Sequence, residues 1–198
     1  MNTITVPSRD QVSAESQLLF DVLQKRVGKV PNLYATMGYS PFALKAFLDF
    51  EETLNKGAFN AKEREAVALI VSEVNGCGYC LAAHTMLAMK RGFSKSETMD
   101  IRKGEVSDPK LSAIILLAKA IVETKGSIET KGSVGETKGS VETKGSPAND
   151  LLAPFYAVGF DEAALMELVG LITLRIYTNY VYALSGIPLD FPAADPIQ

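Results

Sequence analysis

Apolar residues recur at intervals of three and four along most of this chain of 198 residues, which is the spacing of one face of an α-helix. The pattern predicts helices over about residues 18–23, 33–39, 42–54, 67–74, 77–90, 111–122, 149–158 and 161–184. The alternation of apolar and polar residues that marks β-strands is almost absent. We therefore predict an all-α protein, with a single domain over residues 1–198 at this length.

Residues that favour helix ends stand at the borders of these segments. Ser13 and Asn60 precede helices as candidate N-caps, and Gly28 is a natural stop for the first helix. Asn75 and Gly76 interrupt the apolar pattern in the middle of the chain. Cys77 is therefore expected in the first turn of a new helix.

A low-complexity tract lies between two of the predicted helices. The pentapeptide Glu-Thr-Lys-Gly-Ser begins at Glu123, Glu129, Glu136 and Glu142. This period is far shorter than the roughly 20–50 residues of solenoid repeats, and a glycine in every copy weakens a helix. Removal of residues 128–146 would leave a smooth helix–turn–helix pattern. We predict that residues 124–146, approximately, are an inserted and exposed loop that takes no part in the function.

The composition is that of a soluble globule with a real core, since 47% of the residues are hydrophobic and 22% are charged. A formal net charge of −3 gives no basic surface for nucleic acid or for an anionic membrane. No apolar run approaches the roughly 20 residues that span a bilayer, and residues 1–7 lack the features of a signal peptide. These observations favour a cytoplasmic protein that binds neither nucleic acid nor membrane.

The cysteines and the histidine are confined to one short segment. The chain has two cysteines, Cys77 and Cys80, and one histidine, His84, all within eight residues. Two cysteines this close would cross-link only a tiny loop, so they are poor candidates for a stabilising disulfide in a secreted protein. In a cytoplasmic protein such a pair indicates redox or metal chemistry.

Thiol chemistry needs a thiolate, and this segment offers two ways to form one. Unpaired amides and the helix dipole favour a negative sulfur in the first turn of a helix. His84 follows Cys80 by four residues and Cys77 by seven, which places the three side chains on one helical face. His84 could then take a proton from Cys80 directly or through a water. An oxidant would convert one thiolate to a sulfenic acid, and the other cysteine would condense with it to a disulfide.

The imidazole needs an acid to orient it, and two glutamates are candidates. If the helices fold back at Asn75 and Gly76, Glu65 and His84 lie at similar distances from the bend and can meet. Glu73 would lie close only if the helix continued straight. We favour Glu65.

Two other interpretations of the segment remain. Cys77, Cys80 and His84 could bind a metal ion together with a carboxylate, although the chain has no second cysteine pair to complete a common zinc site. The cysteines could also be inert and buried. The thiol interpretation requires no cofactor and no metal.

The core of the chain resembles the AhpD-like alkylhydroperoxidase branch of the carboxymuconolactone decarboxylase family. From Glu65 to His84 it reads EAVALIVSEVNGCGYCLAAH, with the family's order of a glutamate, a CxxC pair and a histidine four residues further on. Residues 28–33, 40–41, 178–180 and 188–190 resemble flanking parts of the peroxidase-related members. One position departs from the best-known members, which carry a relay histidine where this chain has Tyr79.

The resemblance implies a compact helical bundle that assembles into homo-oligomers, as trimers or hexamers. It implies that Cys80 attacks a peroxide or small disulfide substrate, that Cys77 resolves the product, and that His84 is a base supported by Glu65. The reductant would be an unidentified partner protein. Neutral Tyr79 cannot act as a base near pH 7, so the proton relay must be shorter or weaker. The alternatives are a lyase or isomerase of the family's decarboxylase type, acting on a small lactone acid, and a non-catalytic metal-binding oligomer.

Overall fold

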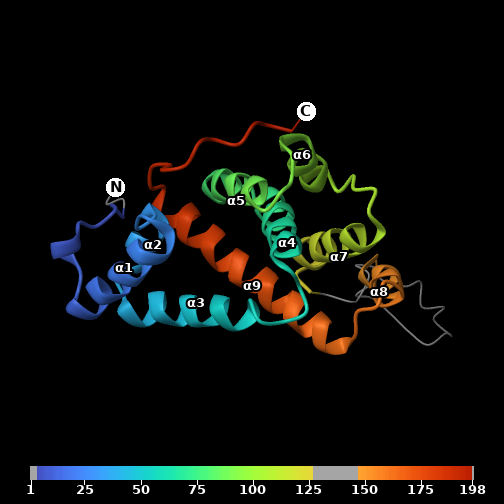
Figure 1. The fold of residues 1–198 in the computed structure, drawn as a ribbon, viewed down its shortest axis with the longest axis horizontal. Helices are drawn as coiled ribbons and strands as arrows, with labels where there is room; N and C mark the ends of the chain where they lie inside the picture. The colour runs from blue at the N-terminus through green and yellow to red at the C-terminus, as the bar shows by residue number, and fades with distance from the viewer. Residues whose placement is uncertain (1–3, 127–146, 198) are drawn as a thin grey trace, which may run out of the picture.

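A computed structural model describes residues 4–126 and 147–197, and these residues form helices and connecting loops without a strand (Figure 1). A short 3-10 helix, Arg9–Gln11, opens the described chain. The α-helices are α1 (Ala14–Val27), α2 (Asn32–Met37), α3 (Pro41–Leu54), α4 (Ala61–Val74), α5 (Gly78–Lys90), α6 (Lys95–Lys103), α7 (Pro109–Thr124), α8 (Pro147–Ala157) and α9 (Glu162–Ser185). The prediction of an all-α fold is confirmed for these residues. The loop predicted at 124–146 lies outside the described residues from 127 onward.

The helix ends follow from local side-chain chemistry. The Asn60 side chain accepts the amides of Lys62 and Glu63, and the Glu63 carboxylate accepts the Asn60 amide in return, which satisfies the free donors at the start of α4. Gly28 ends α1 with φ of 84°, a left-handed conformation that glycine adopts without strain. Both positions were predicted as helix borders.

Helix α6 is absent from the pattern-based prediction. Only Met99 and Ile101 are apolar among its nine residues, so it carries almost no hydrophobic periodicity. Its ends define it instead. Ser94 and Glu97 form a reciprocal capping box at the start, and Gly104 ends the helix with φ of 81°.

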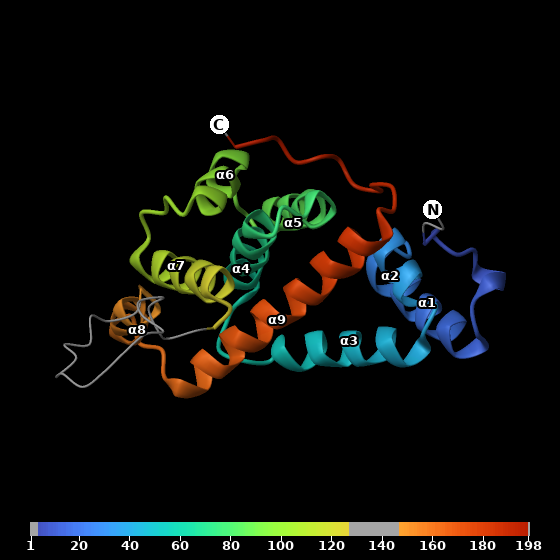
Figure 2. The ribbon, with the colours of Figure 1, turned by 180° about the vertical axis from the view of Figure 1, so that it is seen from behind.

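Two helices organise the rest of the molecule. Helix α4 packs against α5, α6, α7 and α9. Helix α9 runs diagonally from α8 to α2 in both ribbon views and also packs against α3 (Figures 1 and 2). The N-terminal helices α1 to α3 therefore lie at one end and α6 to α8 at the other, with α4, α5 and α9 between them. None of the helices in the described ranges combines the length and apolar character needed to cross a bilayer.

Two apolar clusters meet at the start of α5. The larger one surrounds α4, where Val67, Leu69 and Val71 are fully buried. The smaller one joins α1, α2 and α3 to the C-terminal half of α9. Cys77 and Cys80 belong to the smaller cluster. The cysteine turn is thus held between the two ends of the molecule.

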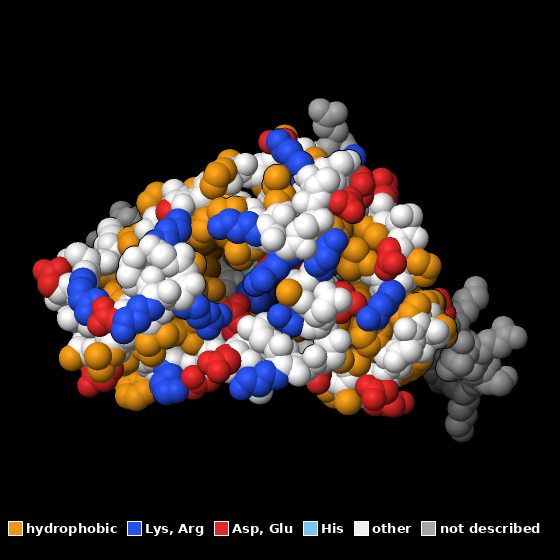
Figure 3. All heavy atoms as spheres, viewed as in Figure 1, with side chains coloured by type: hydrophobic (Ala, Val, Ile, Leu, Met, Phe, Trp, Pro, Cys, Tyr) orange, Lys and Arg blue, Asp and Glu red, His pale blue; other side chains and the backbone are white. Residues whose placement is uncertain are grey.

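One face of α9 leaves apolar side chains in contact with solvent. They recur at helical spacing, with 63% of Met166, 38% of Val169, 39% of Tyr177, 60% of Tyr180 and 80% of Leu184 exposed. We call these five residues the α9 stripe. Elsewhere on the surface, Lys and Arg side chains gather near the middle of the face seen in Figure 3.

Candidate active site

The turn between α4 and α5 places both cysteines. Gly76 has φ of 62°, and the following amide of Cys77 donates to the Ser72 carbonyl over 2.9 Å. Cys77 is the N-cap of α5, where its sulfur accepts the amide of Cys80 over 3.4 Å. Both thiols therefore lie in the first turn of α5, as predicted, where the helix dipole favours a negative sulfur.

The two sulfurs are in direct contact, and their pKa values are shifted in opposite directions. Both cysteines are free and buried, and the Cys77 thiol donates to Cys80 Sγ over 2.6 Å. This hydrogen bond, helped by the charge of His84 and by Asn179 and Thr178, lowers the pKa of Cys80 to about 6 against the cost of burial. The same bond, together with burial, raises the pKa of Cys77. Cys80 is the thiolate of the pair, and Cys77 is the thiol that stabilises it.

Helix α9 forms the wall behind the sulfurs. Cys80 Sγ contacts Thr178 Oγ1 at 3.9 Å. The Asn179 amide donates to Ser72 Oγ over 3.3 Å and accepts from the Asn75 side chain over 2.8 Å. The turn that carries Cys77 is thereby fixed to α9.

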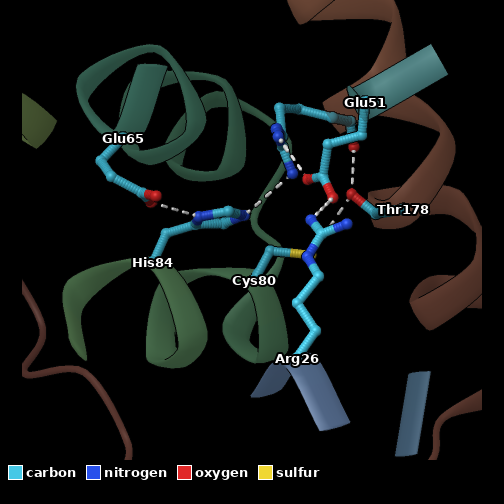
Figure 4. A network of polar contacts seen from close by, with 7 residues as sticks. Arg26, Glu51, Glu65, Cys80, His84 and Thr178 are labelled. Carbon is cyan, nitrogen blue, oxygen red and sulfur yellow. Dashed lines mark hydrogen bonds and ion pairs between the residues drawn. The ribbon is translucent and has the colours of Figure 1, made fainter. Parts of the chain in front are cut away.

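His84 and Glu65 meet as predicted. His84 Nδ1 lies 2.7 Å from Glu65 Oε2, and about an eighth of each side chain is exposed, 12% and 14% respectively (Figure 4). Burial raises the pKa of Glu65, but the hydrogen bond and charge of His84, with the charges of Arg175 and Arg91, bring it below its ordinary value. Glu65 is therefore ionised at neutral pH.

The alternative acid, Glu73, points elsewhere. Its Oε2 accepts a hydrogen bond from Arg102 Nε over 2.6 Å, which ties α4 to α6. The preference for Glu65 over Glu73 is thus matched by the geometry.

The direct Cys80–His84 contact allowed by the helical spacing is not formed. Within the described residues, the hydrogen-bonding partners of Cys80 Sγ are Cys77 and Thr178, while His84 Nε2 faces Arg175 Nη1 at 3.4 Å. His84 acts on Cys80 through its charge rather than through a bond in this conformation. A proton passing between them therefore needs a water or a rotation of the ring.

Arg175 is a member of the site that the sequence analysis did not identify. It is 6% exposed, and its Nη2 donates to Glu51 Oε1 over 3.1 Å. Arg26 donates to the other oxygen of Glu51 over 3.3 Å, so residues from α1, α3 and α9 form one charged chain that ends at His84 (Figure 4). The available signal was the one basic residue of α9, which stands between Leu174 and Ile176.

Tyr79 has a structural place rather than a place in a proton relay. Its hydroxyl donates to Asp190 Oδ1 over 2.5 Å and accepts the Leu33 amide over 3.2 Å. Its ring packs against Tyr182 and Phe191. Burial, followed by the bond to Asp190, raises its pKa, so the phenol stays neutral. Tyr79 joins the start of α5 to α2 and to the C-terminal segment.

The described part of the chain does not form the metal site that was considered as an alternative. There, no group of three or more His, Cys, Asp or Glu side chains lies close enough together to hold a metal ion. Cys77, Cys80, His84 and a carboxylate do not converge on one point.

Residues 41–123 match the sequence profile of the carboxymuconolactone decarboxylase family. This segment of the chain is similar to that family. The matched segment runs from α3 to α7 and includes Glu65, both cysteines and His84.

Known proteins resemble the chain in part of the sequence or in the fold. The uncharacterized protein YdfG of Bacillus subtilis (strain 168) is 34% identical over 53 residues, so the match spans 27% of this chain and 36% of YdfG. Peroxidase-related proteins from Ralstonia eutropha JMP134, called an alkylhydroperoxidase AhpD core, and from Silicibacter sp. TM1040 align with TM-scores of 0.75 and 0.71. The debrominase Bmp8 aligns with a TM-score of 0.72.

These structural alignments cover nearly the whole chain at low identity. The Ralstonia protein is 16% identical and covers 93% of this chain and 90% of its own. The corresponding values are 19%, 95% and 89% for the Silicibacter protein and 17%, 96% and 93% for Bmp8. At such identities the likeness is one of fold, and it confirms the AhpD-like fold expected from the sequence.

Proposed function

We propose that this protein is a thiol-dependent peroxidase, with Cys80 as the peroxidatic and Cys77 as the resolving cysteine. The observation that carries the proposal is the pair of touching sulfurs with opposite pKa shifts. A thiolate at neutral pH is the form that attacks a peroxide, and a neutral thiol beside it is ready to resolve the product. The match of residues 41–123 to the family profile and the AhpD-like fold support the same chemistry.

In the first step the proton of Cys80 passes through a water to His84 Nε2, the ring nitrogen that is not bonded to Glu65 and that faces Arg175. The thiolate then attacks the terminal oxygen of a hydroperoxide, and the O–O bond breaks. Sulfur loses two electrons and becomes a sulfenic acid. The departing alkoxide takes the proton from His84 and leaves as an alcohol.

In the second step Cys77 attacks the sulfenic sulfur of Cys80. A disulfide forms, and the hydroxyl group leaves with the Cys77 proton as water. The two sulfurs already touch at 2.6 Å, so this step needs little movement of the backbone. A dithiol on a partner protein then returns two electrons to the disulfide by exchange. The proposal places the protein in the cytoplasm, where such reductants keep the pair reduced.

Tyr79 takes no part in proton transfer in this mechanism. Its hydroxyl is committed to Asp190 and the Leu33 amide, so it supplies no relay between Cys80 and His84. His84 with Glu65 is the whole acid–base system of the site. A small hydroperoxide that brings its own hydroxyl, or a water, would bridge the gap between Cys80 and His84.

Thiol counting before and after one equivalent of hydrogen peroxide tests the proposal. The wild-type protein should lose both thiols and form an internal disulfide. Cys80→Ser should keep its remaining thiol, and Cys77→Ser should accumulate a sulfenic acid that a dimedone probe captures. Persistence of both wild-type thiols, or equal oxidation in Cys80→Ser, would exclude a peroxidatic Cys80.

Two competing activities give different results. A lyase or isomerase acting on a small lactone acid would keep its activity in the Cys77→Ser/Cys80→Ser double variant. A thiol-dependent dehalogenase is suggested by Bmp8, a debrominase whose cysteine-to-alanine variant is known in complex with 2,3,4-tribromopyrrole. Such an enzyme would lose both thiols on incubation with a brominated pyrrole and release bromide, while peroxide would oxidise it no faster than a free thiol.

A further inference from the structure

Two arginines share one glutamate beside His84. Arg175 Nη2 donates to Glu51 Oε1 over 3.1 Å, and Arg26 Nη2 donates to Glu51 Oε2 over 3.3 Å (Figure 4). We call Arg26, Glu51 and Arg175 the arginine triad. Only 8% of the Arg175 side chain and 13% of the Glu51 side chain are exposed. A buried charge is costly unless it is paired, and the triad has two cations for a single carboxylate.

Arg175 has hydrogen-bond donors to spare for an anion. A guanidinium carries several N–H groups in a planar fork, and Arg175 uses Nη2 for Glu51. Its Nη1 lies 3.4 Å from His84 Nε2, which is longer than the usual hydrogen bond of about 2.7–3.2 Å. Nη1 is therefore available to a closer acceptor. Arginine is the side chain best suited to bind a carboxylate, through two parallel hydrogen bonds.

The backbone of α9 places Arg175 close to the reactive sulfur. Thr178 Oγ1 donates to the Arg175 carbonyl over 2.8 Å and lies 3.9 Å from Cys80 Sγ. Next to Arg175, His84 and Glu65 keep 12% and 14% of their side chains exposed, so solvent reaches this side of the site. A molecule that enters there comes within reach of the guanidinium.

The charges around the triad do not cancel its positive excess. Arg64 of α4 and Arg91 after α5 act on this region with two further positive charges. Glu65 and the Cys80 thiolate supply two negative charges. The groups that act most strongly here are thus four arginines (Arg26, Arg64, Arg91 and Arg175) against three anions (Glu51, Glu65 and the thiolate). His84 adds to the excess whenever its ring is protonated and never reduces it.

The surface over this region has the same sign. Lys and Arg side chains gather near the middle of the face in Figure 3, over the place where α4, α5 and α9 meet in Figure 1. The chain as a whole carries a formal charge of −3, so this surface is opposite in sign to the protein average. A positive surface raises the local concentration of anions and speeds their arrival.

We infer that Arg175 binds the carboxylate of the substrate, and that the peroxide reduced at Cys80 is an organic hydroperoxide that carries a carboxylate. One positive charge in excess matches a monoanion of this kind. A neutral alkyl hydroperoxide would leave the guanidinium without a counter-charge. This inference rests on the proposed peroxidase function and names the class of its substrate.

Two alkylating reagents that differ in charge test the anion site without any peroxide. Iodoacetate carries a carboxylate, and iodoacetamide is a neutral molecule of nearly the same size. Both react with the thiolate and release iodide, so the ratio of their rates at Cys80 is independent of the thiolate fraction. The ratio is measured at neutral pH and low ionic strength, with mass spectrometry to assign the site. N-acetylcysteine amide, an uncharged free thiol, gives the reference ratio.

The wild-type ratio of iodoacetate to iodoacetamide should exceed the reference about tenfold, because a cation close to the sulfur attracts the charged reagent alone. Arg175→Met should lower it to near the reference, and Arg175→Lys should keep part of the preference. Glu51→Gln should raise it, since the triad then loses its negative charge. Arg102→Met is the matched control and should leave the ratio unchanged, because buried Arg102 pairs with Glu73 instead.

A folded Arg175→Met protein with the wild-type ratio would overturn the inference, as would a wild-type ratio no higher than the reference. If Arg175→Met does not fold, Arg26→Met replaces it, since 46% of the Arg26 side chain is exposed, and an unchanged ratio there has the same meaning. If neither reagent labels Cys80, calorimetry with hexanoate and hexanamide decides: preferential binding of hexanoate supports the anion site, and equal binding or none overturns it.

The substrate class itself is tested in the peroxidase assay. A hydroperoxide that carries a carboxylate should be reduced with a higher kcat/KM than its methyl ester, and Arg175→Met should remove the difference. Equal values for acid and ester in the wild-type protein would overturn the inference. Absence of activity toward every peroxide would refute the proposed function alone, because the alkylation ratio is measured independently of it.

Discussion

Glu65 Oε2 accepts the Nδ1 proton of His84 over 2.7 Å, although the two residues lie 19 positions apart on helices α4 and α5. The turn at Asn75 and Gly76 reverses the chain between them. The contact fixes the orientation of the imidazole and directs Nε2 toward Arg175, beside the cysteines. It also pairs the ring with a charge carried by another helix.

Removal of that charge should slow the reaction with peroxide. In Glu65→Gln the amide can still accept from Nδ1, but it no longer stabilises the protonated ring that forms when Cys80 loses its proton. We expect peroxide-dependent thiol loss to slow about tenfold, less than the roughly 10²–10⁴-fold contribution of a complete acid–base group. Stopped-flow oxidation at neutral pH measures this rate. Glu73→Gln is the control, because Glu73 pairs with Arg102, and equal slowing in both variants would contradict the role of Glu65.

The pH dependence of alkylation should report the polarised cysteine pair. Cys80 has a pKa lowered to about 6, so its thiolate forms as the pH rises through 6 and is lost below it. Iodoacetamide should therefore label Cys80 first, with a half-maximal rate near pH 6, while Cys77 stays unlabelled because its pKa is raised. Mass spectrometry of the modified peptide assigns the site.

The Cys77 hydrogen bond is the largest cause of this shift. Cys77→Ala removes the donor, so the half-maximal pH for Cys80 labelling should move upward toward that of an ordinary thiol. Cys77→Ser keeps a hydroxyl donor and should move it less. A midpoint that is the same in wild type and Cys77→Ala would show that the pair is not coupled.

Loss of the Tyr79 hydroxyl should cost stability more than activity. Tyr79→Phe leaves the buried Leu33 amide and the Asp190 carboxylate without their shared partner. We expect the free energy of unfolding to fall by about 1–3 kcal/mol, the usual cost of a buried polar group that loses its bond. Urea unfolding measures it. Tyr180→Phe, at a residue that is 60% exposed, should change stability by less than about 0.5 kcal/mol.

The α9 stripe should support the homo-oligomer that the family resemblance predicts. Its five apolar residues follow one face of the helix, interrupted by exposed Thr173, and exposed apolar surface commonly marks an interface. We propose that copies of this chain associate through it, and Tyr180→Glu combined with Leu184→Glu should then reduce the mass measured by light scattering to that of a smaller species. Asp49→Ala on the exposed face of α3 is the control. A wild-type monomer, or a double variant of unchanged mass, would contradict this interface.

Local signals were enough to predict most helices and part of the site. Residues that begin or end helices, such as Asn60 and Gly28, act within a few residues of their own position. The CxxC pair and His84 lie on successive turns of the same helix. Glu65 could be inferred because one bend relates α4 to α5. Helix α6 was missed because capping rather than apolar periodicity defines it.

The remaining site residues depend on contacts that no local pattern encodes. Arg175 and Thr178 reach the site only because α9 crosses behind α5, almost a hundred residues later in the chain. Their spacing of three residues is compatible with any helix. The sequence also indicated that Tyr79 departs from a relay histidine, but its hydrogen bonds to Leu33 and Asp190 required the tertiary structure.

The order of residues along the chain has a consequence for biosynthesis. A ribosome completes Cys77 and Cys80 long before it reaches Thr178, Asn179 and Asp190, which hold the cysteine turn in place. A nascent chain that stops short of α9 therefore carries two thiols without the wall that buries them. Its cysteines lack the contacts with Thr178 and Asn179 during translation, and the buried site is complete only when the last helix docks.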